Sequence, residues 1–127
     1  MVKGTFSDLL GIKILELRPG YCKGELSIRD NLKHPGGFLH GGVLMSLADT
    51  VASAGLVASL EDGQGFSTIE LKINFLRVVK GGRVMAEARC LHQGRRTSVW
   101  EVDVFNEENL LVAKATTSLM VLDLQKG

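Results

Sequence analysis

The chain contains few cysteines and few histidines, and this scarcity limits its chemistry. It has two cysteines, Cys22 and Cys90, and three histidines among 127 residues. The cysteines lack the Cys-x-x-Cys spacing of redox and zinc motifs, and the five residues do not cluster as metal ligands do. Ser46 and Ser53, in the apolar segment at residues 41–60, have no histidine at a triad spacing. We therefore expect no metal site, no cofactor and no serine-hydrolase triad.

The chain also lacks an excess of charge of either sign. Fifteen Lys and Arg side chains face fourteen Asp and Glu side chains, which leaves a net charge of +1. Such a balance produces no field that would attract nucleic acid or an anionic membrane, so neither is expected as a partner. The first ten residues lack the basic region and apolar core of a signal peptide. The expected location is the cytoplasm.

No long apolar run is free of charge. Residues 41–60 are about long enough to cross a bilayer, but Asp49 lies near their middle. A carboxylate at that depth costs on the order of 3 kcal/mol, and Gly, Ser and Thr dilute the hydrophobicity further. We interpret the segment as a buried helix that carries a single carboxylate, not as a membrane span.

What the chain does contain is alternation of apolar and polar residues, which predicts strands. Ile69, Leu71 and Ile73 fall on one face of an extended segment, while Glu70 and Lys72 fall on the other. Later segments repeat this period and are separated by short turn sequences, so the second half predicts a four-stranded meander. The predicted strands cover residues 12–17, 25–28, 69–75, 84–90, 100–104 and 110–122.

These elements predict an α+β fold with an antiparallel sheet of about six strands and one long helix. The helix is apolar over most of its circumference, as expected when a sheet wraps around it. Hydrophobic residues make up 45% of the chain, enough for a core. Because no repeat, linker or low-complexity tract is visible, residues 1–127 are expected to form a single domain.

The few polar residues of the predicted helix form one stripe. Ser46, Asp49, Thr50 and Ser53 are spaced three and four residues apart, so they lie on one helix face. An isolated carboxylate in an apolar helix is costly unless it is paired or functional. Asp49 is thus expected to face a reaction site or, in the alternative, to be a structural carboxylate paired across a dimer interface.

The segment before and within this helix carries a recognisable motif. Residues 34–42 read His-Pro-Gly-Gly-Phe-Leu-His-Gly-Gly, and Leu-Ala-Asp follows at residues 47–49. With the downstream strands, this pattern resembles the hotdog-fold acyl-CoA thioesterases of the phenylacetate-pathway and 4-hydroxybenzoyl-CoA thioesterase type, over nearly the whole chain. The resemblance implies a hotdog fold, in which one antiparallel sheet wraps around a central helix. It also implies assembly as a dimer, commonly as a tetramer of two dimers.

The resemblance implies hydrolysis of an aryl- or medium-chain acyl-CoA to the free acid and CoA, with CoA as part of the substrate. The Gly41 amide would polarise the thioester carbonyl, since free N–H groups at a helix start carry positive partial charge. Asp49 would act as nucleophile or general base. His40 would orient the loop or bond near the carbonyl.

Two further positions are assigned by the resemblance alone. Ser67, eighteen residues after Asp49, matches a Ser or Thr that assists placement of the water in some relatives. His34 stands where relatives usually carry Asn or Gln to hold the water or the substrate. An imidazole can also donate or accept a hydrogen bond, so hydrolysis stays compatible with this difference.

The site is expected to lie between subunits. Basic residues near the subunit edges would bind the CoA phosphates, and the first candidates are Arg95 and Arg96 at the start of a strand. Arg77 and Lys80 form a second candidate pair. The apolar candidates for the acyl pocket are Phe38, Leu44, Met45 and Phe66.

Two other functions use the same fold. A hotdog module can bind acyl-CoA without turning it over, as in lipid-responsive regulators, but those regulators carry an additional DNA-binding segment. Hotdog hydratases usually show an Asp and a His close together near the helix start, whereas here His40 precedes Asp49 by nine residues. The thioesterase interpretation therefore fits better. The acyl group, and the choice between CoA and an acyl carrier protein, stay open.

Overall fold

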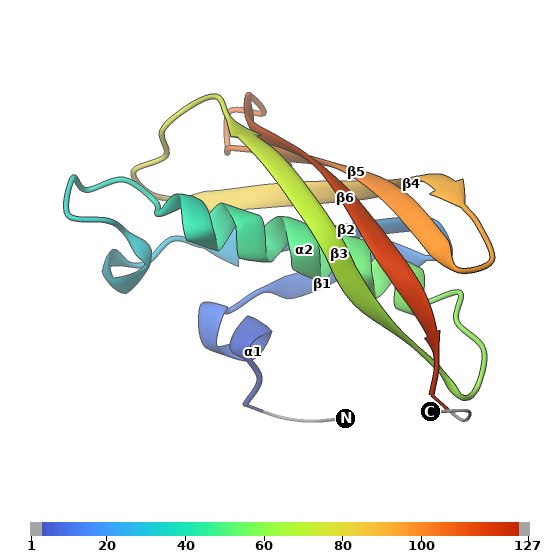
Figure 1. Ribbon diagram of the computed structural model, residues 1–127. Helices are drawn as coiled ribbons and strands as arrows, with labels where there is room; N and C mark the ends of the chain where they lie inside the picture. Colours follow the sequence, from blue (N-terminus) through green and yellow to red (C-terminus); the bar gives the residue numbers. More distant parts are fainter. Residues whose placement is uncertain (1–3, 125–127) are drawn as a thin grey trace.

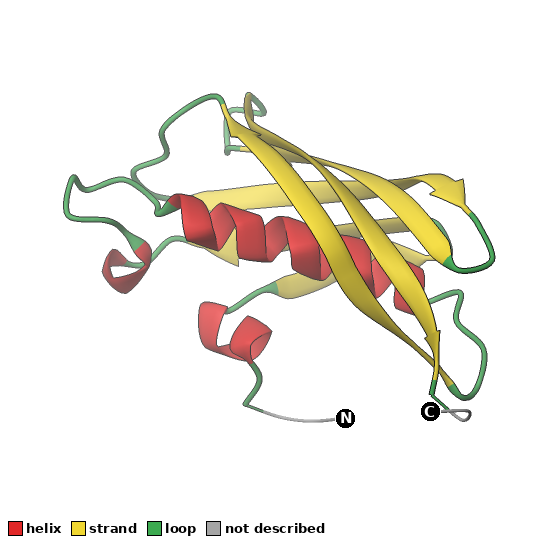
Figure 2. Ribbon diagram, in the orientation of Figure 1, coloured by secondary structure: helices red, strands yellow, loops and turns green. Residues whose placement is uncertain are grey.

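The computed structural model describes residues 4–124, in which a six-stranded antiparallel sheet wraps around the helix α2 (Gly41–Val57) (Figure 1). This confirms the predicted α+β hotdog architecture. Figure 2 shows α2 running along the sheet, with a long loop extending beyond its start. The other elements are α1 (Phe6–Leu10), β1 (Lys13–Arg18), β2 (Tyr21–Ser27), a 3₁₀ turn (Asp30–Leu32), β3 (Gln64–Phe75), β4 (Arg83–Gln93), β5 (Thr97–Phe105) and β6 (Leu111–Asp123).

The strand order is β1-β2-β4-β5-β6-β3, and every neighbouring pair is antiparallel. Only β4, β5 and β6 form a meander, so the predicted four-stranded meander is wrong in its first member. The loop at residues 76–82 carries the chain from one edge of the sheet to β4, and β3 pairs with β6 instead. As a result, β3 is an edge strand that lies beside α2 (Figure 1).

The core lies between α2 and the concave face of the sheet. Leu47, Ala48, Val51 and Ala52 have no exposed surface, and they face residues such as Trp100 that are equally buried. Gly55 allows the closest approach, since a Cβ at that position would lie 2.5 Å from the Trp100 ring. The absence of a side chain at Gly55 thus lets the helix settle against the largest residue of the core.

Several elements differ from their predicted bounds. The helix ends at Val57, three residues before the predicted end, and β3 begins at Gln64, five residues before the predicted start. The helix α1 and the 3₁₀ turn at residues 30–32 were not predicted. Both are short, so they carry too little of the helical period to be recognised in the sequence. Within residues 4–124, no helix is long and apolar enough to span a membrane.

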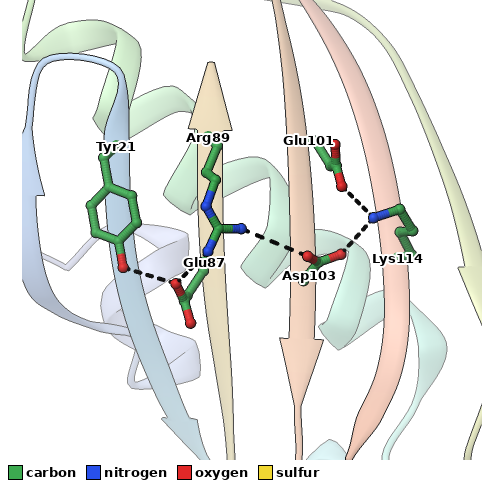
Figure 3. Close-up of polar contacts among 6 residues, drawn as sticks. All are labelled: Tyr21, Glu87, Arg89, Glu101, Asp103 and Lys114. Carbon is green, nitrogen blue, oxygen red and sulfur yellow. Dashed lines mark hydrogen bonds and ion pairs between the residues drawn. The ribbon is translucent and has the colours of Figure 1, made fainter. Parts of the chain in front are cut away.

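The convex face of the sheet carries a ladder of ion pairs (Figure 3). Arg89 lies 2.9 Å from Glu87 and 3.7 Å from Asp103, and Lys114 lies 2.9 Å from Asp103. Lys114 also donates to Glu101, and these hydrogen bonds to Glu101 and Asp103 raise its pKa. This face of the sheet is therefore polar, and the apolar side chains of the strands point toward α2.

Candidate functional site

The start of α2 leaves one backbone amide unbonded. His40 is the N-cap residue in an extended conformation, and its Nδ1 accepts a hydrogen bond of 2.8 Å from the Gly42 N–H. Among residues 4–124 we find no hydrogen bond from the Gly41 N–H. The first N–H groups of a helix form its positive end, so this amide can bind a polarised oxygen. A Cβ at Gly41 would lie 3.0 Å from the Phe75 ring, so glycine keeps this approach open.

Both histidines of the motif are bonded to the backbone in the same way. The Nδ1 of His34 accepts from the Gly36 N–H at 2.9 Å, as that of His40 does from Gly42. Because Nδ1 is the acceptor, the proton of each neutral ring lies on Nε2 and can be donated outward. The Phe38 ring contacts His34 edge-on, and the backbone of the two residues is bonded, which folds residues 34–38 into a tight loop.

Asp49 lies on the face of α2 that the sheet leaves uncovered. This face carries the predicted polar stripe, whose members are half-buried while the opposite face is fully buried. The Oγ1 of Thr68 donates to Oδ1 of Asp49 at 2.8 Å, and within residues 4–124 no hydrogen bond to Oδ2 is found. The carboxylate opens into a hollow of about 220 Å³, which is also lined by Met45, Ser46, Thr68 and Leu71.

The hydroxyl beside Asp49 is that of Thr68, which corrects the prediction of Ser67. Ser67 pairs across the sheet with the exposed Met120, whereas Thr68 pairs with the fully buried Leu119. The register shifts between Thr68 and Glu70, so a β-bulge inserts one residue there. Ser67 is assigned by the resemblance alone, and because of this bulge simple alternation counted backward from Leu71 would also place Ser67 and not Thr68 on the inward face. Ile69, the inserted residue, is 55% exposed and does not share the inward face predicted for it.

The two reactive groups of one chain lie too far apart to act together. Gly41 and Asp49 are eight residues apart on α2, which is about 12 Å along the helix axis. Gly41 packs over Phe75 at the end of β3, while Asp49 bonds to Thr68 near its start. A single carbonyl group cannot contact both within hydrogen-bonding distance.

The predicted CoA-binding residues fall at opposite ends of β3. The ammonium of Lys80 lies 5.6 Å from the centre of the Phe38 ring, beside the start of α2, and in the same loop the Arg77 N–H donates to the carbonyl of Val112 on β6. Arg95 and Arg96 instead line a hollow of about 510 Å³ beyond the start of β3. Within one chain, the two pairs therefore lie too far apart to bind the same nucleotide.

The predicted acyl-pocket residues divide into two kinds. Met45 is 40% exposed and lines the hollow at Asp49, and Phe38 lies at the rim of the loop before α2. Leu44 is 4% exposed and packs in the core, because it faces the sheet and not the polar stripe; its assignment to the pocket is corrected. Phe66 also packs against the core.

The arrangement suits addition to a polarised carbonyl. It offers outward N–H donors at the start of α2 and a carboxylate with an adjacent hydroxyl at its middle. Within the part of the chain that is described, no group of three His, Cys, Asp or Glu side chains could hold a metal ion.

Comparisons with known proteins agree with this chemistry. The profile of the thioesterase superfamily matches residues 36–113. The 1,4-dihydroxy-2-naphthoyl-CoA hydrolase of Listeria monocytogenes is 30% identical over 119 residues, covering 94% of this chain and 97% of the relative. The crystal structure of a thioesterase from Haemophilus influenzae matches with a TM-score of 0.91 and 31% identity over 96% of this chain and 85% of that one.

The PaaI protein of the phenylacetic acid degradation operon of Escherichia coli matches with a TM-score of 0.85. Its identity to this chain is 26%, over 91% of this chain and 83% of that one. The resemblance inferred from the His-Gly-Gly motif is thus confirmed. The chain belongs to the thioesterase superfamily, with its hotdog fold, and is a thioester hydrolase.

Proposed function

We propose that this protein hydrolyses an aryl- or medium-chain acyl-CoA to the free acid and CoA, at a site that two copies of the chain build together. The observation that carries the proposal is the half-buried Asp49 carboxylate, held by Thr68 at one oxygen and open at the other. The name of the Listeria relative, a CoA thioester hydrolase, supports the substrate class.

In this proposal, the start of α2 stabilises the oxygen of the thioester. The carbonyl oxygen accepts from the Gly41 N–H, which has no partner among residues 4–124, and the Nε2–H of the N-cap residue His40 is a second donor at this helix start. As the carbonyl carbon is attacked, negative charge develops on this oxygen, and the positive end of the helix stabilises it. Gly41 is thereby the donor of an oxyanion hole.

Asp49 supplies the attack. As general base it takes a proton from a water whose oxygen adds to the carbonyl carbon; the C–S bond then breaks, and the CoA sulfur leaves as a thiol after taking up a proton. As nucleophile, its carboxylate would add first and water would hydrolyse the resulting anhydride. The hydrogen bond from Thr68 to Oδ1 orients Oδ2 toward the substrate in either route.

In a dimer, Gly41 of one copy can lie close to Asp49 of the other. Within residues 4–124 the outer edge of β3 pairs with no strand, so two copies can pair β3 with β3 in antiparallel orientation and continue the sheet. An axis that crosses β3 midway between Thr68 and Phe75 brings Gly41 of one copy to Asp49 of the other. Such a dimer also covers Phe75 and Met45, which are 50% and 40% exposed in one chain.

Pairing of β3 with β3 also brings together the basic residues that were predicted to bind CoA. Antiparallel pairing places the start of one β3 beside the end of the other, so Arg95 and Arg96 of one copy approach Arg77 and Lys80 of its neighbour. Four basic side chains then surround one site, where they can bind the nucleotide phosphates. Assembly of two dimers into a tetramer and location in the cytoplasm stay predictions.

Release of thiol from acetyl-, hexanoyl-, benzoyl- and palmitoyl-CoA tests the proposed function. We expect Asp49→Asn to lower kcat by about 10²- to 10⁴-fold and to keep the folded circular dichroism spectrum, because it removes a base and little volume. Asp62→Asn, in the exposed turn after α2, is the matched control and keeps full activity. Binding of acyl-CoA without thiol release by the wild type would instead support the non-catalytic module.

A further inference from the structure

A groove of about 470 Å³ lies between the short helix α1 and the first turns of α2. Its lining is mainly apolar: Leu10, Leu32 and Val43 are buried along it, and Phe6 and Leu9 of α1 stand on its wall. This size falls within the range of small-molecule pockets, which are lined mostly by apolar side chains with a few polar groups. The groove therefore suits an apolar group of moderate size.

The groove is continuous with the proposed reaction site. His40 and Gly42 line it, and these two residues flank Gly41, whose N–H binds the thioester oxygen in the proposed site. A thioester whose carbonyl oxygen is bound at Gly41 therefore lies at the mouth of the groove, beside the neighbouring residue Gly42. Its acyl group can extend directly between the two helices.

The cations of the groove are already engaged with protein groups. Arg29 donates through Nη1 to the Leu10 carbonyl at 3.1 Å and through Nη2 to the Leu9 carbonyl at 2.9 Å. Lys33 lies 3.3 Å from Asp30. Among the described residues that line the groove, both cations are directed to protein oxygens, which favours an uncharged acyl group.

Arg29 is the anchor of α1. This helix has five residues, too few to be stable in isolation, and it begins with a Thr5–Asp8 capping box. At its other end, the guanidinium of Arg29 binds two carbonyls that no longer have helical partners. Leu10 is buried, whereas Phe6 and Leu9 are 62% and 70% exposed. The position of these two apolar side chains over the groove therefore depends on Arg29.

We propose that α1 is the outer wall of the acyl pocket and that Arg29, by holding α1 in place, sets which acyl groups the enzyme accepts. The inference rests on the proposed function, since it takes the thioester carbonyl to be bound at Gly41. An acyl chain or aromatic ring in the groove covers Phe6 and Leu9, and so gains binding energy in proportion to its apolar area. A short acyl group leaves them uncovered.

Steady-state kinetics with acetyl-, hexanoyl- and benzoyl-CoA test this inference. Arg29→Met keeps the aliphatic stem but removes the donors to α1. We expect it to lower kcat/KM for hexanoyl- and benzoyl-CoA by about tenfold, mainly through KM, and to change acetyl-CoA turnover less than about twofold. Arg83→Met, on the far side of the sheet, removes another exposed arginine and serves as the matched control.

Leu9→Ala leaves the hydrogen bonds from Arg29 to the α1 backbone in place and shortens only the side chain that faces the groove. It therefore tests the inference even if Arg29→Met folds poorly. It is expected to reduce the preference for hexanoyl-CoA over acetyl-CoA by about tenfold, whereas Leu110→Ala, an exposed leucine elsewhere, leaves the preference unchanged. Equal effects on all substrates, or none on any, overturn the role of α1 while hydrolysis by the wild type still stands. If the wild type hydrolyses no thioester, the proposed function itself fails.

Discussion

At the residue scale, the N–H of Gly41 is available because His40 bonds to the next amide along the chain. Gly41→Pro deletes this N–H and little else, since proline is favoured at the first helical position and His40 already has an extended backbone. We predict a fall in kcat of about 10²- to 10³-fold, the usual cost of losing one oxyanion donor. The measurement is steady-state thiol release.

Gly41→Ala is the matched control for that variant. It adds the same Cβ, to which the Phe75 ring must yield by a few tenths of an ångström, but keeps the N–H. We expect Ala to retain most of the activity. If the Ala variant is as slow as the Pro variant, crowding at Phe75 and not the lost donor explains the defect.

The hydroxyl beside Asp49 gives a second prediction at this scale. Thr68→Val removes the hydrogen bond to Oδ1 while it keeps the shape of the side chain. We expect kcat to fall by about tenfold, the equivalent of the 1.5 kcal/mol typical of a hydrogen bond to a charged group. Ser67→Ala, on the other face of β3, should change kcat by less than about twofold. The reverse order of these effects would restore Ser67 to the role that the sequence suggested.

Single residues could be predicted where a helix carried them. The spacing of Ser46, Asp49 and Ser53 placed Asp49 on an open face of α2, as the structure confirms. Thr68 could not be found in this way, because the bulge before Glu70 breaks the alternation from which the inward face was counted. Nor does the spacing reveal Arg29, whose role depends on a helix of five residues.

At the scale of the elements, the packing of α2 against the sheet depends on Gly55. Ala has the higher helix propensity by about 1 kcal/mol, but a Cβ there lies 2.5 Å from the Trp100 ring, which is fully buried and cannot yield freely. We predict that Gly55→Ala lowers the free energy of unfolding by about 1–3 kcal/mol. Urea denaturation followed by Trp100 fluorescence measures this change.

Gly81→Ala is the control for that stability measurement. Gly81 lies in the loop before β4, and a Cβ there meets no atom within 4 Å. Its variant should differ from the wild type by less than about 0.5 kcal/mol. If Gly55→Ala leaves the free energy of unfolding unchanged, α2 is free to shift away from Trp100.

The elements themselves were largely predictable, and their order was not. Alternation and turn residues identified the strands and the helix, since each depends on local periodicity. The position of β3 beside β6 depends on where the loop at residues 76–82 carries the chain. No local pattern encodes that crossing, yet it makes β3 an edge strand and thereby opens the route to a dimer.

At the scale of the whole molecule, the ladder of ion pairs on the convex face suits contact with water, and the open edge of β3 suits contact with a second chain. Ion pairs such as Arg89–Glu87 suit a face in contact with water, whereas the β3 edge, to which no other strand of the described chain is bonded, combines backbone donors and acceptors with apolar side chains. We predict that light scattering coupled to gel filtration gives an even multiple of the 13.8 kDa chain. A monomer with full turnover would contradict the shared site.

Mixing two inactive variants tests whether Gly41 and Asp49 act from different chains. In a heterodimer of Asp49→Asn and Gly41→Pro, one site carries both lesions and the other carries neither. Because random pairing makes half of the dimers mixed, co-expression should restore about a quarter of the wild-type activity per chain. If each chain instead holds a complete site, every site stays damaged, and the mixture will be no more active than its two components.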